Sequence, residues 1–387
     1  MPRINWRAGF FGNEIVTKKA ISAPQKRKWV RLTRACNNRC LFCLDADALD
    51  GRHESLDGIT SALREGREEG CRRVVLSGGE PAIHPEFIRI IGLARQLGYT
   101  HVQVITNGRM FSYSEFLRQA VKAGLSEVTF SVHGASAAQH DRLAGVPGAF
   151  SQTLLGISNA VKIRGLIVSS DIVVNGVNVD SLFEIVSLLH RLKINEYDLL
   201  HLIPFGRAWK NWKILSYNPL DKKNIFRRVF RFAEAAGAHL WTNRFPLPLL
   251  EGEERYMQHP DKILDEVRGA RSVFNKFIRS GKKMFCSGRR CRFCVLEQFC
   301  LDLEKLRAAG FLRAAPVPRC LPGKPFERKR VSGGSDVMEI AAFYIRERMT
   351  VKAAACAQCR ENIRCRGAHV KTVMQKGFSA LVPVGRV

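Results

Sequence analysis

The chain has 387 residues, of which 46% are hydrophobic, so it can bury a large core and favours an ordered protein of about two domains. It has no continuous apolar run of about 18 residues, and its basic N-terminus lacks the apolar segment of a secretory signal. These features argue against a membrane span and against secretion, and they leave the cytoplasm as the expected location.

Two features of the composition point to partners. The net charge of +27 is compatible with an acidic partner, although clustered arginine by itself indicates little. Twelve cysteines in a reducing compartment favour metal or iron–sulfur ligation over disulfides.

Short β-rich runs alternate with helical periodicity in the N-terminal half of the chain. Six strands are predicted, at Trp29–Leu32, Arg73–Leu76, His101–Thr106, Glu127–Val132, Ser169–Val174 and Asp198–Ile203. Five helices are predicted between them, at Ser55–Glu69, Pro85–Leu97, Ser112–Ala123, Phe150–Ile163 and Asp180–Leu192. Repeated strand-then-helix units indicate parallel βαβ construction. The sequence therefore predicts an α/β fold, a partial (β/α)6 TIM-like barrel with its active-site loops at the C-terminal ends of the strands.

The alternation stops after the sixth predicted strand. Helices interrupted by Pro246 and Pro248 follow, and from Cys286 the chain is rich in Cys, Arg, Gly and Pro. We therefore expect four parts: an N-terminal extension (1–27), the barrel core (28–225), a helical connector (226–285) and a loop-rich iron–sulfur cluster domain (286–387). The last part has few periodic apolar segments, so bound metal must organise it.

Three cysteines directly after the first predicted strand have the spacing C-x3-C-x2-C: Cys36, Cys40 and Cys43. Three thiolates on one tight loop can bind three irons of a [4Fe–4S] cluster and leave the fourth iron open to a further ligand. The competing interpretation is a zinc loop, but structural zinc requires four ligands, and no fourth Cys or His lies nearby.

This spacing, with Phe42 before the last cysteine, resembles the radical SAM superfamily. The sequence Gly78-Gly79-Glu80-Pro81 after the second strand resembles that family's GGEP motif. The resemblance implies that Gly78, Gly79 and Glu80 receive the methionine ammonium of S-adenosylmethionine (SAM). It also implies an enzyme that cleaves SAM reductively to a 5′-deoxyadenosyl radical.

Other matches to the family are less specific. Asn107, in Thr106-Asn107-Gly108, occupies the place of the family's TNG motif, and Ser131 that of a serine on the SAM carboxylate. The family often has an arginine directly before a glycine about a dozen residues later; here Ala144 precedes Gly145, and Arg142 is the nearest arginine. Asn175 and the Ile203–Pro204 backbone fall where relatives hold ribose and adenine.

Two further residues, His133 and Cys71, can be explained by packing alone. His133 is either a base or hydrogen donor at a strand end, or a packed loop histidine. Cys71 is most simply a small buried apolar residue.

The C-terminal cysteines repeat one spacing, C-x2-C-x5-C. The cysteines concerned are Cys286, Cys291, Cys294, Cys300, Cys320, Cys356, Cys359 and Cys365. Eight thiolates suffice for two auxiliary [4Fe–4S] clusters, and two zinc knuckles are the alternative. The second repeat resembles the SPASM domain of radical SAM maturases, but His369 stands where that pattern has its fourth cysteine, and no cysteine follows. The ligand grouping therefore stays open, with His369 either a ligand or a free side chain.

The resemblance implies hydrogen abstraction from a substrate, and SPASM-like relatives mostly modify peptides or proteins. A peptide or protein substrate is the leading hypothesis, with flavodoxin or ferredoxin as the reducing partner. The alternatives are a small metabolite or sugar, RNA, and a non-enzymatic Fe–S electron carrier. Nucleic acid is not favoured, because aromatic residues do not interleave the basic runs.

Overall fold

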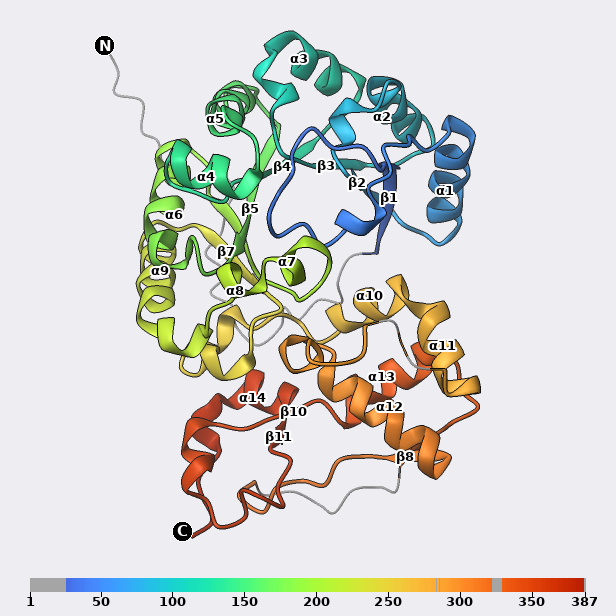
Figure 1. Ribbon diagram of the computed structural model, residues 1–387, viewed down its shortest axis with the longest axis vertical. Helices are drawn as coiled ribbons and strands as arrows, with labels where there is room; N and C mark the ends of the chain where they lie inside the picture. Colours follow the sequence, from blue (N-terminus) through green and yellow to red (C-terminus); the bar gives the residue numbers. More distant parts are fainter. Residues whose placement is uncertain (1–25, 283, 285, 322–328, 386–387) are drawn as a thin grey trace, which may run out of the picture.

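The computed structural model describes residues 26–282, 284, 286–321 and 329–385 (Figure 1). The predicted N-terminal extension, residues 1–27, lies almost entirely outside the described residues. None of the described helices is both long enough and apolar enough to cross a membrane.

Seven parallel strands pair in chain order to form one sheet. They are β1 (Arg27–Thr33), β2 (Arg73–Gly78), β3 (His101–Thr106), β4 (Glu127–Ser131), β5 (Ile167–Val174), β6 (Glu196–His201) and β7 (His239–Asn243). β2, β3 and β5 are rich in valine and isoleucine, which pack well on a pleated surface. The predicted α/β architecture is confirmed.

Helices cover the outer face of this sheet, and the main core lies between the two layers (Figure 1). They are α1 (Leu56–Glu68), α2 (Phe87–Gln96), α3 (Ser114–Ala123), α4 (Ala137–Ala144), α5 (Ala149–Ala160), α6 (Leu182–Arg191) and α9 (Lys223–Ala235). Sequence signals set their ends. The Ser55 hydroxyl accepts a hydrogen bond from the Gly58 amide at the start of α1, and Gly124 ends α3 in the left-handed conformation.

Alternation along the strands divides apolar from polar side chains. Residues such as Val74, Val102 and Val128 face the helices in the core. Their neighbours in the sequence, such as Gln103 and Thr129, therefore point to the opposite, concave face. This concave face, which we call the lumen, is polar.

The segment predicted as a purely helical connector contains a strand, so the prediction of six strands is wrong. β7 pairs with β6, and its Leu240 joins Phe226 and Phe230 of α9 in the main core. The strand was missed because His-Leu-Trp-Thr-Asn is short and lacks Val and Ile. The sheet unit therefore extends past the predicted boundary at residue 225.

Four helices build a second apolar core (lower right in Figure 1). They are α10 (Lys262–Gly269), α11 (Arg271–Ser280), α12 (Glu297–Ala309) and α13 (Val337–Glu347). A buried ion pair joins Arg348 to Asp302 at 2.6 Å, and a short antiparallel pair, β8 (Phe311–Arg313) and β9 (Arg330–Ser332), flanks the helices. This helical lobe takes α10 and α11 from the predicted connector.

The remaining C-terminal elements pack on the barrel instead. β10 (Thr350–Val351) pairs with β11 (Ala368–His369), and α14 (Val370–Lys376) follows. Val351, Val370 and Val373 belong to the main core. Residues 286–387 are thus divided between two cores, and the predicted domain boundaries do not follow the packing.

Candidate functional site

The loop that carries Cys36, Cys40 and Cys43 is anchored by segments distant in the sequence. The amides of Arg39 and Leu41 donate to the carbonyls of Ala144 and Leu143 at 2.8 and 2.9 Å, at the C-terminal end of α4. On the other side, two short helices, α7 (Gly206–Lys210) and α8 (Trp212–Leu215), approach the loop. The Arg207 amide donates to the Cys43 carbonyl at 2.9 Å. The Asn211 side chain donates to the Leu41 carbonyl at 3.0 Å.

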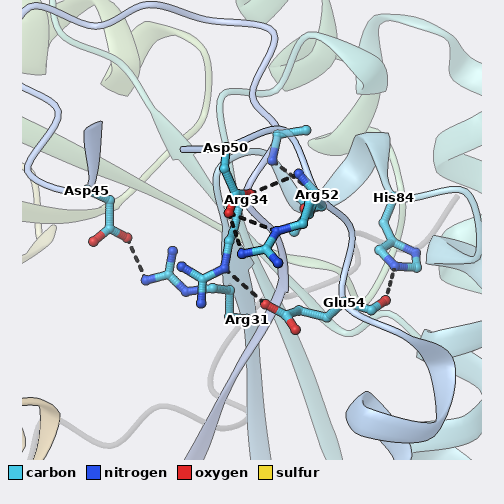
Figure 2. A network of polar contacts seen from close by, with 9 residues as sticks. Arg31, Arg34, Asp45, Asp50, Arg52, Glu54 and His84 are labelled. Carbon is cyan, nitrogen blue, oxygen red and sulfur yellow. Dashed lines mark hydrogen bonds and ion pairs between the residues drawn. The ribbon is translucent and has the colours of Figure 1, made fainter. Parts of the chain in front are cut away.

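The return segment after the triplet is held against β1 by a polar network (Figure 2). Arg31 pairs with Asp45 at 2.8 Å, and Arg34 with Glu54 at 3.3 Å. The His84 ring bonds the Glu54 carbonyl at 3.0 Å, which ties the segment to the turn after β2. The network fixes the triplet loop at the C-terminal end of the sheet.

The triplet cysteines are partly buried, and burial raises the pKa of their thiols. The pKa of Cys40 is raised to about 12 and that of Cys36 to about 11. Thiolates in such a place need positive charge nearby, which bound metal supplies. The Asn38 amide donates to Cys36 Sγ at 3.4 Å, and an N–H donor of this kind stabilises an ionised sulfur. The chemistry of this donor set fits an iron–sulfur cluster.

Three arginines that the sequence analysis did not single out surround the triplet. Arg109 donates to the Asn37 carbonyl and, at 3.0 Å, to the Asn38 side chain. Positive charge on Arg109 lowers the pKa of Cys36, against the larger effect of burial, and Arg207 does so for Cys40. Buried Nη1 atoms of Arg31 and Arg207 have no hydrogen-bond partner among the described residues. Arginine before the triplet and after the sixth strand was visible in the sequence, but only the fold brings these residues together.

The two glycines of the Gly-Gly-Glu motif lie against the triplet loop. A Cβ on Gly79 would collide with the Ala35 backbone, and one on Gly78 (φ +145°) with the Thr33 carbonyl. The Gly79 amide donates to the Thr33 carbonyl at 2.8 Å. Only glycine therefore permits this contact between the motif and the loop that precedes Cys36.

Glu80 is buried and organises neighbouring turns. Its carboxylate accepts from the Ala82 amide (3.0 Å), the Thr106 hydroxyl (2.6 Å) and the Asn107 amide (2.7 Å). Burial raises the pKa of Glu80, and these donors oppose the rise. Its predicted contact with the methionine ammonium stays a prediction, because three donors already occupy much of the carboxylate.

The structure places the other predicted cofactor residues in four different environments. The Asn107 side chain donates to Asn37 Oδ1 at 2.6 Å, so this residue clamps the triplet loop. Ser131 ends β4 at the mouth of the lumen. Arg142 is exposed on α4. Asn175 is fully buried, and its side chain bonds within its own turn, which does not support the predicted ribose contact.

The side chains of His133 and Cys71 are both packed in the protein interior. The His133 ring packs edge-on against Phe42 at 4.5 Å, and its Nδ1 accepts from the Val173 amide at 3.2 Å. Burial lowers the pKa of His133, so the ring is neutral. These contacts favour the packed interpretation of His133. Cys71 is confirmed as a buried member of the main core.

The eight C-terminal cysteines separate into two sets of four. Cys286, Cys291, Cys294 and Cys300 form set A, which lies beside the helical lobe. Burial, together with negative charge on its three neighbours, raises the pKa of Cys300 to about 12. Cys286 and Cys300 pack against the second core.

Set B consists of Cys320, Cys356, Cys359 and Cys365. Burial raises the pKa of Cys320, and the other three thiols add to the rise. Cys320 and Cys356 pack against the main core, so set B belongs to the barrel. Amides of Gly367 and Val384 donate to Cys365 and Cys359 Sγ at 3.2 and 3.4 Å, as expected for ligand sulfurs.

His369 is engaged elsewhere. Its ring nitrogens contact the Ile345 carbonyl (2.9 Å) and the Lys371 amide (3.2 Å), so it acts as a helix cap for α14. Across the part of the chain that the structure describes, no three His, Cys, Asp or Glu side chains are arranged to hold a metal ion. The predicted metal ligands, all in sets A and B and the triplet, therefore remain predictions.

An aromatic contact joins set A to the triplet region. Trp212 of α8 packs against Phe293, between Cys291 and Cys294, with ring centroids 4.7 Å apart. Arg290 lies 5.4 Å from the ring centroid of Trp209. Since α7 also bonds Cys43, this short helix pair touches both cysteine regions.

Comparison with known proteins agrees with this geometry. Residues 30–189 match the model of the radical SAM superfamily. "Probable GTP 3′,8-cyclase" of Saccharolobus solfataricus is 32% identical over 178 residues, which cover 46% of this chain and 57% of that protein. The protein of the same name from Sulfolobus acidocaldarius is 31% identical over 201 residues, 52% of this chain and 62% of its own. The chain thus spans somewhat more than half the length of these relatives.

Among solved structures, SuiB of Streptococcus suis bound to precursor peptide SuiA aligns with a TM-score of 0.49 and 14% identity, over 92% of this chain and 74% of that chain. The sequence match shows that residues 30–189 of this chain resemble the radical SAM domain. The cofactors of the superfamily are SAM and a [4Fe–4S] cluster.

Proposed function

We propose that this chain is a SAM-cleaving enzyme that abstracts hydrogen from a peptide or protein. The observation that carries the first part is the contact between the Gly-Gly-Glu motif and the triplet loop. Gly79 and Glu80 donate backbone hydrogen bonds to Thr33 and Ala35, directly before Cys36. The Gly-Gly-Glu backbone and the triplet thiols therefore lie at the same end of the lumen, where both would contact SAM.

Each part of the chain has a role in this proposal. Cys36, Cys40 and Cys43 would hold the cluster, which when bound supplies one electron to SAM and yields methionine and a 5′-deoxyadenosyl radical. Arg109 and Arg207 offset negative charge at the thiols, and Asn107 with Glu80 fixes the loop. The lumen, continuous with this end of the sheet, would receive the substrate. A flavodoxin or ferredoxin would be the external electron donor.

The form of the sheet supports a large substrate. The strands pair in one open series, with β1 and β7 at its ends, and each end strand carries a half-exposed tryptophan, Trp29 and Trp241. An opening between end strands leaves room for part of an extended polymer. The two further cysteine sets support the maturase type of chemistry, as their SPASM-like spacing implies.

The test of SAM cleavage is anaerobic reconstitution with iron, sulfide, dithionite and SAM. The wild type should release 5′-deoxyadenosine and methionine, and the Cys36→Ala/Cys40→Ala/Cys43→Ala variant should release neither. Cys71→Ala is the matched control, because this thiol lies in the apolar core, and it should keep the activity. Cleavage that persists in the triple variant would refute the proposal.

A nucleotide substrate is the second candidate, because the relatives named as GTP 3′,8-cyclases are 32% and 31% identical to this chain over the aligned residues. GTP added to the reconstituted enzyme distinguishes the two. Stimulated formation of 5′-deoxyadenosine together with loss of GTP would favour the nucleotide. No change would leave the peptide as the stronger candidate.

A further inference from the structure

The lumen contains two aspartates side by side. Asp171 of β5 pairs in register with Asp198 of β6, which pairs with Trp241 of β7. On the other side, Asp171 is paired with Ser131, at the mouth of the lumen. Residues in register on parallel strands point to the same face, and adjacent strands are about 4.8 Å apart. The row Ser131–Asp171–Asp198–Trp241 therefore runs from the SAM end into the lumen; we call it the acidic row.

The two carboxylates have little compensation. Oδ1 of Asp198 is buried without a hydrogen-bond partner among the described residues, and no ion pair to either aspartate is found there. Burial, and for Asp171 repulsion from Asp198, raises the pKa of both groups, that of Asp198 to about 6, although a hydrogen bond with the Asn243 side chain opposes the rise at Asp198. Two unpaired carboxylates at this separation are costly unless a cation joins them.

The cations nearest to the acidic row are engaged with other groups. Arg244 bonds Glu266 (2.5 Å), Lys262 lies 3.7 Å from Asp265, Arg73 bonds Glu127 (2.5 Å), and Arg27 lies 5.8 Å from the Trp29 ring centroid. The charges of Lys262, Arg244 and Arg27 oppose the rise in the pKa of Asp198, without an ion pair to it among the described residues. The acidic row therefore lacks an ion-pair partner in the part of the chain that the structure describes.

A further acceptor faces the lumen from β3, two strands away from Asp171. Gln103 is only 8% exposed, and its Oε1 has no partner among the described residues. Its amide group is oriented by a donated hydrogen bond to the Thr129 hydroxyl (2.8 Å), which in turn contacts the Ser169 hydroxyl at 2.9 Å. Ser169 precedes Asp171 by two residues on the same face of β5. A buried amide oxygen without a donor indicates a ligand that brings an N–H group.

Trp241 completes the surroundings of such a ligand. It stands next to Asp198 in the row and is 50% exposed. An indole face attracts an ammonium group and excludes water from it.

We propose that the acidic row binds a primary ammonium group of the substrate, from a lysine side chain or from a peptide amino terminus. An ammonium group has three donors, which the oxygens of the two carboxylates can accept. This inference rests on the proposed peptide substrate and specifies a charged group of that substrate that the lumen would bind. It predicts that the enzyme selects substrates by charge.

The test measures binding to the reconstituted full-length protein without reductant, so it does not depend on SAM cleavage. The probes are N-acetyl-lysine amide, glycinamide for an amino terminus, and N-acetyl-norleucine amide as the uncharged control, followed by calorimetry or ligand-observed NMR. The lysine or the glycinamide probe should bind roughly tenfold or more tightly than norleucine, and whichever binds more tightly identifies the source of the amine.

Two isosteric variants locate the site. Asp171→Asn and Asp198→Asn should each weaken amine binding roughly tenfold, whereas Asp180→Asn, a carboxylate paired with Lys222 outside the lumen, should not. Equal binding of lysine and norleucine probes to the wild type would overturn the inference without any variant. Unchanged amine binding in both variants would do the same. Failure of the proposed function would show instead as absent 5′-deoxyadenosine, with amine binding retained.

Discussion

The barrel and the helical lobe show two ways of joining a cysteine set to an apolar core. In the barrel, the sheet and its helices form the core. The triplet loop lies at the C-terminal end of the sheet, where backbone hydrogen bonds with α4 and α7 hold it. In the helical lobe, set A packs into the side of a smaller core built by α10–α13. Set B, although close in sequence to the lobe, packs on the barrel. The core against which a cysteine set packs therefore shows which structural unit it belongs to, whereas its position in the sequence does not.

The largest expected effect separates set A from set B. Reconstituted wild type should bind about 12 iron atoms, and Cys294→Ala and Cys359→Ala should each lose about four, as for two all-cysteine clusters. Because Cys359 belongs to the set on the main core, its loss should also lower the melting temperature of the barrel, while Cys294→Ala should affect the helical lobe alone.

Iron analysis, limited proteolysis and calorimetry measure these outcomes. Cys71→Ala should retain all the iron and serves as the control. Stoichiometric zinc with only four irons would rule out two auxiliary clusters. Equal destabilisation of the barrel by both variants would contradict the division between the two cores.

A smaller effect is expected at Glu80. Glu80→Ala removes the acceptor of three hydrogen bonds that orient the turns around the glycines and Asn107. Bonds to a charged group are each worth about 1.5–3 kcal/mol, so SAM affinity should fall roughly ten- to a hundredfold. Equilibrium binding of SAM measures the change. Glu86→Ala, which removes only an exposed pair with Arg89, should bind SAM normally.

The smallest expected effect is a pH dependence of barrel stability. Because the folded-state pKa of Asp198 is raised to about 6, the folded protein holds more protons than the unfolded chain between about pH 4 and 6. Stability should therefore decrease as the pH rises through this window, and Asp198→Asn should remove that loss. At pH 7.5 the variant should be about 1–2 kcal/mol more stable than the wild type, and at pH 4 no more stable.

Denaturation of the wild type and the Asp198→Asn variant at several pH values, with Asp180→Asn as the control, measures whether stability decreases as the pH rises. Arg27 and Arg244 act on both aspartates, Glu127 acts on Asp171, and Lys262 acts on Asp198. A variant that is less stable than the wild type at pH 7.5 would show that these cations already compensate Asp198.

The local sequence pattern was sufficient to predict the repeated strand-and-helix units of the fold. Val74, Val75 and Leu76 form an apolar run in β2, and Val102 and Val104 alternate with polar residues in β3. The spacing of Cys36, Cys40 and Cys43 itself indicates a metal or cluster site. β7 was missed because a five-residue strand with Trp and His has no such pattern. The grouping of eight cysteines could not be read from spacing, since Cys320 reaches set B only through the fold.

The acidic row illustrates the same limit. Asp171 and Asp198 lie 27 positions apart, and in the sequence each is only one of several polar residues in its strand. Their meeting depends on the register of β5 and β6. Likewise, Arg109 and Arg207 became recognisable only when the strand ends placed both beside the triplet.

The anchoring of the triplet loop has a consequence for the order of assembly. Cys36 to Cys43 are made early during synthesis, yet their loop is closed by Ala144 and by Asn211, the latter 170 residues beyond Leu41. Such distant contacts form late, after the strands between them have paired. The thiols thus stay accessible on the growing chain, and the enclosed site is completed only when α7 and α8 have been synthesised and docked.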